Sequence, residues 1–488
     1  MEINNPIKIK GTTGDWDIVI GLEVHAQVIS NLKLFSNGAS DFRKEANSKL
    51  DLLDIGLPGT LPVINKKAVD QAIKTGLALN AKINKTSIFD RKNYFYPDLP
   101  LGYQISQFKD PIVSGGYLDI DINEDKTKRI RIERLHLEQD AGKSLHDQSP
   151  DKTFIDYNRA GVALMEIVSC PDLSDWNEAG SYLSKLRSIL RFAGTCDGNM
   201  DEGSLRCDAN VSVRVSGKPL GTRCEIKNLN SIKNLMKAIE YEAKRQVKSL
   251  EKGNTIRQET RLFDVNSGTT KTMRSKEEAH DYRYFPDPDL LPLELTEERI
   301  DNIRKGLPEL PDELKIRLIK EYKLGAYDAR VISSDQETAK YFETLTVKRE
   351  AKQAANWIIS NLFGKLNETG KGIKESPIPA NELGELLDLI NNQIISNKIA
   401  KEVFEEMFKT SNTAGEIIEK KGLKQISNTD EIEVIVDKII HENQSQKQQF
   451  KGGNTKVLGW FVGQVMKETK GQANPELVNK VIINRLKN

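Results

Sequence analysis

Strict alternation of apolar and polar residues marks several stretches in the first half of the chain. Between Ile18 and Val28 every even position is apolar, while the odd positions include Glu23 and His25. Because successive side chains of a strand point to opposite faces, this pattern predicts a half-buried strand. Its polar face would display a carboxylate and an imidazole two residues apart. The alternative is a strand whose polar face is only solvated.

A second alternating stretch, Leu135–Ser144, leads from acids into a small-residue turn. His136, Glu138 and Asp140 fall at every second position, so an extended chain would show all three on one face. Carboxylates arranged in this way could hold a hard cation such as Mg²⁺. The alternative is a solvated β-turn with surface charges.

The end of this stretch, Ala-Gly-Lys-Ser, resembles the last part of a phosphate-binding loop. The complete Walker pattern needs a glycine five residues before Gly142, and that position is Leu137. The sequence therefore argues against a Walker nucleotide fold. It leaves the ammonium group of Lys143 as a partner for a phosphate.

Three later stretches add polar side chains of the same kind. Gly161–Ser169 is an apolar run with Glu166 in its middle, and a carboxylate there is costly to bury unless a cation or hydrogen-bond donors meet it. A structural ion pair would also satisfy it. Alternation resumes in Asp201–Val211 and in Arg223–Asn230. The polar positions that follow this alternation are Arg206, Asp208, Asn210, Arg223, Glu225 and Lys227, together with Ser212 directly after the first stretch.

If these strands share one sheet, their polar positions form a concavity with several carboxylates and a few cations. Such a set suits a nucleoside triphosphate bound through a divalent metal, because acids hold the metal while arginine and lysine offset phosphate charge. An antiparallel sheet with one solvated face produces the same alternation. The density of acids and histidine opposite arginine and lysine favours the binding site.

Helical periodicity appears twice in the first part of the chain and dominates after about Pro292. Helices are predicted over Lys66–Leu79 and over Asp175–Ala193, the second with Gly194 as its C-terminal stop. In the last part, Lys447–Asn454 is predicted to be a basic glycine loop, which is either a linker or a contact to a phosphate backbone.

These patterns predict an α+β protein with three domains. Residues 1–292 would form a large mixed or antiparallel-sheet domain, residues 293–411 a helical linker domain and residues 412–488 a helical tail domain. A length of 488 residues agrees with roughly three domains, each large enough for its own core.

Composition narrows the class of protein. With 38% hydrophobic and 29% charged residues, the chain is of the globular type rather than disordered or membrane-embedded. No apolar run approaches the roughly 18 residues that span a bilayer, and the N-terminus lacks the apolar core of a secretory signal. A net charge of +1 neither favours nor excludes nucleic acid. The four cysteines are scattered without a CxxC pair, which argues against a structural zinc site or disulfide framework and favours a reducing cytosol.

Several longer motifs are more specific than these patterns. They are Ile20–His25 (IGLEVH), Asp90–Pro97 (DRKNYFYP), Tyr103–Gln107 (YQISQ), His136–Ser144 (HLEQDAGKS), Glu202–Asn210 (EGSLRCDAN), Lys227–Ser231 (KNLNS), Asp281–Pro286 (DYRYFP) and Lys470–Pro475 (KGQANP). Together they resemble the B subunit of the aspartyl/glutamyl-tRNA amidotransferase family. The resemblance runs from about residue 16 to the end of the chain.

The resemblance implies a cradle-shaped catalytic domain, a helical linker and a tail similar to the YqeY family that contacts tRNA. It implies a cytoplasmic heterotrimer with an amidase (the A subunit) and a small third chain (the C subunit), and no membrane or DNA partner. The B subunit would bind Glu-tRNA(Gln), Asp-tRNA(Asn) or both, and would phosphorylate the misacylated side-chain carboxylate with ATP and Mg²⁺. Ammonia from the amidase would then displace the phosphate to form the amide.

Carried over by motif, the resemblance also implies a role for each candidate residue. The implied metal ligands are Glu23, His25 and Glu138. The implied catalytic residues are Glu138, Lys143, Glu166, Arg206 and Lys227. The implied ATP-binding residues are Asp140, Glu202, Asp208 and Asn210. This set suits phosphorylation, which gives a carboxylate a good leaving group and needs mainly positioning and charge neutralisation.

Two kinds of site are not expected in this chain. It shows no glycine/serine-rich amidase signature and no cysteine in a glutaminase-like setting, so its ammonia would come from a partner. Some family members carry a cysteine cluster between the positions of Phe35 and Pro58 that looks like a zinc site. Ser36–Leu57 holds no cysteine here, so zinc is not expected. The rival hypotheses are a stand-alone ATP-dependent amide ligase acting on a small acid and a non-catalytic tRNA-binding scaffold.

Overall fold

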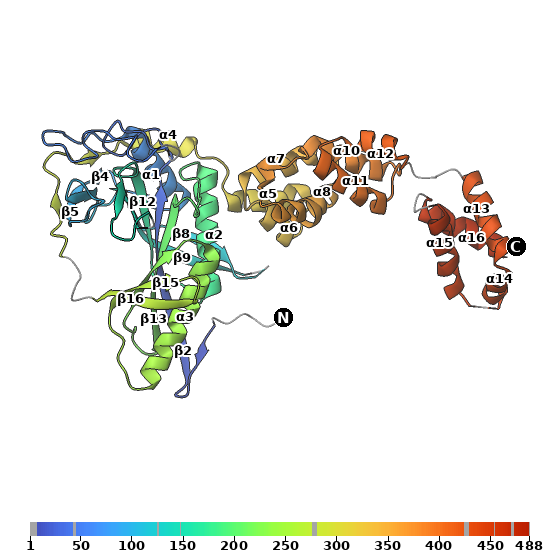
Figure 1. Ribbon diagram of the computed structural model, residues 1–488, viewed down its shortest axis with the longest axis horizontal. Helices are drawn as coiled ribbons and strands as arrows, with labels where there is room; N and C mark the ends of the chain where they lie inside the picture. Colours follow the sequence, from blue (N-terminus) through green and yellow to red (C-terminus); the bar gives the residue numbers. More distant parts are fainter. Residues whose placement is uncertain are drawn as a thin grey trace. The chain divides into compact units, whose positions relative to one another are not determined.

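The computed structural model describes residues 7–41, 45–123, 126–146, 148–275, 281–423, 429–452, 454–469 and 473–487 (Figure 1). The chain folds into two compact units, residues 1–314 and 315–488. Sheets and helices make up the first unit, whereas the described part of the second is helical. The predicted α+β class, a mixed-sheet domain followed by helical domains, is confirmed.

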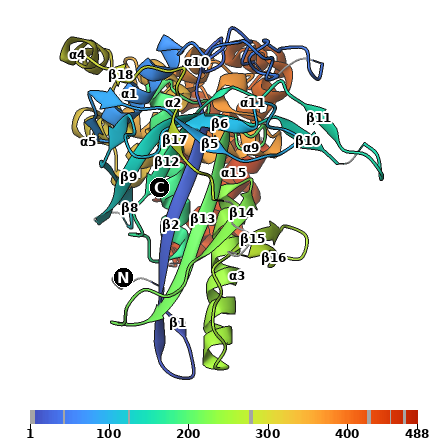
Figure 2. The ribbon, with the colours of Figure 1, turned by 90° about the vertical axis from the view of Figure 1, so that its left-hand side faces the viewer.

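One large mixed sheet organises the first unit. Its strands follow the order β16-β15-β14-β13-β2-β12-β9-β7-β3, with β1 paired to β2 and β8 to β9. Figure 2 shows β2, β13 and β14 side by side; β13 is antiparallel to both, whereas β14 and β15 are parallel. The strands are β1 Ile9–Lys10, β2 Asp15–Gln27, β3 Lys82–Ile83, β7 Val113–Ser114, β8 Tyr117–Asp121, β9 Thr127–Gln139, β12 Ala163–Ser169, β13 Leu205–Val215, β14 Cys224–Leu229, β15 Glu259–Asp264 and β16 Thr269–Ser275.

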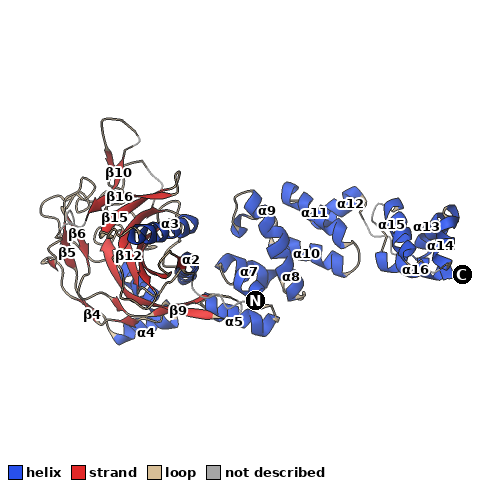
Figure 3. Cartoon of the chain, turned by 90° about the horizontal axis from the view of Figure 1, so that it is seen from below, coloured by secondary structure: helices blue, strands red, loops and turns tan. Residues whose placement is uncertain are grey.

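Alternation along β2 separates the two faces of this sheet, as the sequence predicts. Ile20 and Val24 are fully buried, whereas Glu23 and His25 on the opposite face stay partly exposed. The apolar face packs against helices α2 (Trp176–Ala193) and α3 (Ile232–Glu251), which lie side by side (Figure 3). The other face is therefore left for polar side chains.

The two predicted N-terminal helices begin and end for local reasons. Asp175 caps α2 by accepting hydrogen bonds from the N–H groups of Asn177 and Glu178, and Gly194 ends it in the left-handed conformation, with φ 66°. The earlier helix, α1, spans Lys66–Ala78. Both predictions are confirmed to within one residue at each end.

Smaller sheets surround the polar face. One has the order β17-β5-β6 (β17 Phe285–Pro286, β5 Asp90–Asn93, β6 Tyr103–Ser106), and another is a hairpin of β10 (Lys143–Leu145) and β11 (Phe154–Asp156). A Walker loop would lead into a helix, but the turn before Lys143 leads into this hairpin instead. The sequence-based argument against a Walker fold is therefore confirmed.

The first unit extends beyond the boundary predicted at residue 292. Strand β18 (Leu293–Glu294) pairs with β4 (Thr86–Ser87), and helix α4 (Glu297–Lys305) packs against α1. Leu295 and Ile300 are buried in the core of this unit. Sequence periodicity does not detect these contacts, because they join segments about two hundred residues apart.

The remaining α-helices belong to the second unit, except that α5 begins in the last residues of the first. They are α5 Pro311–Tyr322, α6 Ala326–Ile332, α7 Gln336–Leu345, α8 Ala351–Trp357, α9 Phe363–Glu368, α10 Ala380–Asn391, α11 Asn397–Thr410, α12 Ala414–Lys421, α13 Thr429–Glu442, α14 Gln444–Lys451, α15 Lys456–Glu468 and α16 Pro475–Lys487. Helix α12 packs against α10 and α11, so the linker bundle continues past the predicted boundary at residue 411. Residues of α13, α15 and α16 form a separate apolar core around Phe461.

One prediction in the tail is wrong. The sequence predicts a loop over Lys447–Asn454, but α14 runs through Lys451, and of the described residues in this range only Gly452 and Asn454 lie outside the helix. Glutamine and lysine are good helix formers, and their propensity prevails up to the first glycine. The family motif Lys470–Pro475 is described only from Ala473 onward.

Neither a membrane-spanning helix nor a disulfide bond is found in the described part of the chain. Within these residues, no helix has both the length and the apolar character needed to cross a bilayer. The cysteines at positions 170, 196, 207 and 224 are all free thiols. Burial raises the pKa of Cys196 to about 12, so this thiol stays protonated at neutral pH.

A buried ion pair fixes the long connection between β2 and α1. Lys33 Nζ lies 2.8 Å from Asp54 Oδ2, and neither side chain is more than 1% exposed. The Asp54 carboxylate also accepts hydrogen bonds from the Ser36 hydroxyl at 2.8 Å and the Asp51 N–H at 2.9 Å. This one carboxylate therefore organises the loop.

We expect Asp54→Ala to lower the free energy of unfolding of the first unit by about 3–5 kcal/mol, because it leaves the Lys33 ammonium buried without its partner. Urea unfolding of the full chain, followed by circular dichroism, measures this loss. The control is Glu297→Ala, which removes an ion pair with Lys85 whose side chains are both 62% exposed. Its cost is about 0–1 kcal/mol. Equal losses in the two variants would contradict the assignment.

Candidate active site

The register of the central strands brings distant acids and histidines together. Glu166 on β12 lies beside His25 of β2 on one side and His136 of β9 on the other. On the next strand, Asp208 of β13 is paired with Glu23 of β2. Because paired residues point to the same face, all five side chains project from the polar face of the sheet.

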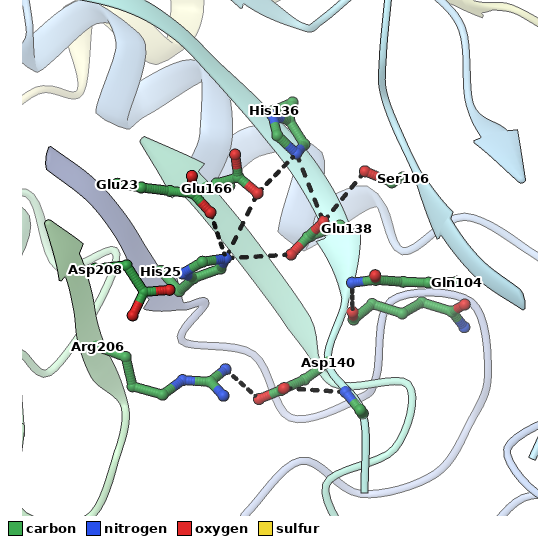
Figure 4. Close-up of polar contacts among 12 residues, drawn as sticks. Glu23, His25, Gln104, Ser106, His136, Glu138, Asp140, Glu166, Arg206 and Asp208 are labelled. Carbon is green, nitrogen blue, oxygen red and sulfur yellow. Dashed lines mark hydrogen bonds and ion pairs between the residues drawn. The ribbon is translucent and has the colours of Figure 1, made fainter. Parts of the chain in front are cut away.

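The side chains meet around the imidazole of His25 (Figure 4). Its Nε2 atom lies 3.5 Å from Glu166, 3.6 Å from Glu138 and 3.7 Å from Glu23. The Nε2 atom of His136 lies 3.4 Å from Glu166 and 3.6 Å from Glu138. We call these five residues, Glu23, His25, His136, Glu138 and Glu166, the carboxylate–histidine cluster.

Burial and mutual charge shift the pKa values within the cluster. Burial alone would lower the pKa of His25, but Glu166 and the other carboxylates raise it to about 8. In the same way Glu166 and Glu138 outweigh burial and raise the pKa of His136 to about 9. Burial, followed by the charge of Glu166, raises the pKa of Glu23 to about 7. The carboxylates and the two imidazoles thus stabilise one another's charged forms in a largely buried site.

This arrangement fits a divalent metal ion. Two overlapping groups, Glu23 with His25 and Asp208, and His25 with Glu138 and Glu166, each place their ligand atoms within 4.8 Å of one another. Most of these atoms are carboxylate oxygens, which Mg²⁺ prefers. A divalent cation would also relieve the repulsion among the acids. The donor set therefore fits Mg²⁺ better than a structural zinc ion.

A pocket of about 460 Å³ opens beside the cluster. Its volume suits a nucleotide-sized ligand. Arg206 Nη2 donates a hydrogen bond of 2.7 Å to Asp140, and Arg159 Nε lies 3.4 Å from the same carboxylate. The polar wall includes Gln27, Lys143, Arg159, Glu202, Arg206 and Asp208. The pocket thus combines cations suited to phosphates with an acid, Asp208, that also belongs to a candidate metal-binding group.

Comparison with known proteins assigns the chain to a protein family. Residues 18–301 match the family model described as the GatB/GatE catalytic domain, and residues 340–486 match the one described as the GatB domain. The chain belongs to the GatB family. The resemblance found in the sequence motifs is therefore confirmed.

Curated relatives of this GatB chain match it over nearly its whole length. A protein of Paramagnetospirillum magneticum is 57% identical over 479 residues, which is 98% of this chain and 99% of the relative. One from Rhodospirillum rubrum is 56% identical, covering 97% and 98%, and one from Wolbachia pipientis is 57% identical, covering 98% and 100%. Each is named as the B subunit of aspartyl/glutamyl-tRNA(Asn/Gln) amidotransferase.

The structure of this GatB chain gathers most of the predicted site residues. Those in the carboxylate–histidine cluster are Glu23, His25, Glu138 and Glu166, and those in the pocket wall are Lys143, Glu202, Arg206 and Asp208. Asp140 forms an ion pair with Arg206, and Lys227 forms ion pairs with both Asp208 and Glu225. Asn210 belongs to neither group, since it lies two residues beyond Asp208 along β13, where it is paired with Gly21.

The sequence assigns no role to two further functional candidates. His136 stands out only in the alternation of its strand, and its contacts with two carboxylates form when β9 lies beside β12. Lys92 comes from β5 of the small sheet. Burial alone would lower its pKa, but the charges of Glu138 and Glu166 raise it, so Lys92 is an ammonium ion. Its strand partner on β6, Gln104, donates a hydrogen bond to the carbonyl of Gln139, next to Glu138. The signal in the sequence is the density of aromatic and charged residues in Asp90–Pro97.

Proposed function

We propose that this chain phosphorylates the side-chain carboxylate of glutamate on Glu-tRNA(Gln), of aspartate on Asp-tRNA(Asn), or of both, and then converts it to the amide. ATP and Mg²⁺ are the proposed co-substrate and metal. The observation that carries the proposal is the carboxylate–histidine cluster. The cluster lies next to Asp208, and Asp208 also lines a nucleotide-sized pocket. The names of the relatives support the RNA substrate and an enzyme of several subunits.

The first step uses the pocket and the cluster together. ATP would lie in the pocket with its phosphates toward Arg206 and Lys143. Glu23, His25, Glu138, Glu166 and Asp208 could hold Mg²⁺, whose charge would be shared with the phosphate oxygens. A carboxylate oxygen of the substrate forms a bond to the γ-phosphorus while the bond to the ADP oxygen breaks. The products are an acyl phosphate and ADP.

The second step replaces phosphate by ammonia. The nitrogen lone pair attacks the acyl carbon, the carbon–oxygen bond to phosphate breaks, and a proton leaves the nitrogen to give the amide and inorganic phosphate. Lys92, with its raised pKa, is placed to neutralise charge on the acyl group beside Glu138.

Ammonia would come from a partner, the amidase or A subunit, which would assemble with this chain and a small C subunit. The free thiols of this chain are poor nucleophiles, because burial raises the pKa values of Cys170, Cys196, Cys207 and Cys224. Thiols of this kind give no support to a glutaminase centre in this chain.

The test is phosphate release from ATP by the chain assembled with its A and C partners. We expect release to require glutamate-charged tRNA(Gln), or the corresponding aspartate-charged tRNA(Asn), because the acyl carboxylate is the phosphoryl acceptor. Uncharged tRNA is the control. Phosphate release that does not depend on tRNA would favour the small-acid ligase, and tRNA binding without any phosphate release would favour the scaffold. Either outcome would contradict the proposal.

A further inference from the structure

A connected array of aromatic rings borders the carboxylate–histidine cluster. From Tyr96 the centroid distances run 6.2 Å to Tyr94, 5.8 Å on to Tyr282 and 6.1 Å on to Tyr284. Tyr284 then stacks on Phe108 at 4.2 Å, with an interplanar angle of 8°. We call these five residues the aromatic array. They come from three segments of the chain, which follow β5, follow β6 and precede β17, and the pairing of β5 with β6 and with β17 joins these segments.

The array lies next to the cluster on the side of Glu138. Lys92 Nζ lies 5.0 Å from the ring centroid of Tyr282 and 6.0 Å from that of Tyr94. On the neighbouring strand, the Ser106 hydroxyl donates to Glu138 at 3.2 Å. Figure 4 shows Ser106 and Gln104 beside Glu138, on the side of the cluster away from Asp208. The array and the nucleotide-sized pocket thus flank the cluster on different sides.

Both ends of the aromatic array are open to solvent, whereas its three middle rings are half-buried. Phe108 is 51% exposed and Tyr96 is 50% exposed, and the adjacent Phe95 is 86% exposed. Packing does not explain rings that touch one another in a row and remain this accessible. Contiguous exposed apolar surface of this kind marks a binding site.

The direction of phosphoryl transfer indicates what binds there. The attacking carboxylate and the departing ADP oxygen lie roughly in line across the phosphorus. If the nucleotide fills the pocket on the Asp208 side, the carboxylate must reach the cluster from the opposite side, past Lys92 and the aromatic array. This carboxylate is carried by an amino acid esterified to the 3′ end of an RNA, whose last bases are unpaired. Proteins bind unpaired bases by stacking them on aromatic rings next to cations.

We propose that the aromatic array is the stacking surface for the unpaired 3′-terminal bases of the charged RNA, which places the esterified carboxylate between Lys92 and Glu138. The inference rests on the proposed function for the identity of the RNA. Beyond that function, it assigns the surface that binds the 3′-terminal bases and the side from which the esterified carboxylate reaches the cluster. Adenine of ATP is a poorer occupant, because the pocket with the phosphate-binding cations lies on the other side of the cluster.

The test measures binding of the full-length chain to an RNA hairpin whose 3′ strand ends in single-stranded ACCA, and to the same hairpin with a flush end. The wild type is expected to bind the overhang more tightly. Phe108→Ala and Tyr96→Ala should each weaken binding of the overhang about tenfold and leave binding of the flush hairpin unchanged, because each removes one stacking surface. Phe108→Trp should restore the affinity.

The matched control is Phe285→Ala. Phe285 directly follows Tyr284, is 44% exposed and is paired with Arg91 of β5. Because neighbouring side chains of an extended segment point to opposite faces, it points away from the array. Equal binding of the two hairpins by the wild type, or an equal loss in Phe285→Ala, would overturn the inference. So would a Phe108→Ala variant that keeps its RNA affinity but binds the amidase more weakly, since the surface would then be a protein interface.

Failure of the inference can be told apart from failure of the proposed function. If charged tRNA stimulates phosphate release with the same KM in the wild type and in Phe108→Ala, the proposed function stands and the stacking surface is wrong. If the overhang preference depends on Phe108 but charged tRNA releases no phosphate, the surface stands and the proposed function is wrong.

Discussion

Glu138→Gln is expected to lower the rate of ATP-dependent phosphate release by at least about a hundredfold. Glu138 is only 3% exposed and its carboxylate contacts both His25 and His136, so it is central to the proposed metal site. Glutamine keeps the shape of the side chain but removes the charge that would hold Mg²⁺. The remaining activity should need a higher Mg²⁺ concentration, which a magnesium titration of phosphate release measures.

The control for this variant lies on the same strand. Glu133 is also on β9, but its side chain is 56% exposed and forms an ion pair with its neighbour Arg134. Glu133→Gln should leave both the rate and the magnesium dependence unchanged. Full activity of Glu138→Gln, in a protein whose circular dichroism and unfolding curve match the wild type, would show that the acid is structural and would favour the scaffold.

Lys92→Met is expected to lower kcat by about a hundredfold with little change in the KM for ATP. Methionine approximates the length of the lysine stem but removes the ammonium group, which carboxylates Glu138 and Glu166 hold in its charged form. The nucleotide pocket lies on the other side of the cluster, so binding of ATP should be spared. Steady-state phosphate release at saturating charged tRNA separates kcat from KM.

Two further variants sharpen this result. Lys92→Arg keeps the positive charge and should recover part of the lost rate. Lys82→Met removes an exposed lysine on β3, outside the nucleotide pocket, and should have no effect. A rise in the KM for ATP at unchanged kcat in Lys92→Met would assign Lys92 to nucleotide binding and contradict its proposed place beside the acyl group.

The strands that carry the cluster and Asp208 can be predicted because alternation is a local property. In β2 and β13 the choice between apolar and polar at each position fixes which face a side chain takes. Alternation therefore places Glu23 and His25 on one face, and Arg206 and Asp208 on another strand's polar face, without any knowledge of strand pairing. The caps of α2 at Asp175 and Gly194 are local in the same sense.

Local sequence patterns fail to predict the structure where a residue's partner on another strand, or a competing helix propensity, determines its place. Asn210 shares the alternation of Asp208, yet its place along β13 sets it beside Gly21 rather than at the pocket. The segment Lys447–Lys451 belongs to α14. The predicted loop rests on the glycines that follow this segment, whereas its own glutamine and lysine residues favour a helix. The region after residue 292 joins the first unit through β18 and α4, whose partners lie far back in the sequence.

The sequence by itself predicted the class of the protein, the polar faces of its strands and most of the residues that the structure brings together in the candidate site. Only the tertiary structure decided that β9 and β13 flank β2 and β12, so that Glu138 and Asp208 meet His25 from two sides. It also brought Lys92 and the aromatic array to the cluster, because β5 pairs with both β17 and β6, and Ser106 of β6 donates to Glu138. The physical reason is that side-chain alternation depends on neighbouring residues, whereas strand order depends on long-range packing of the whole sheet.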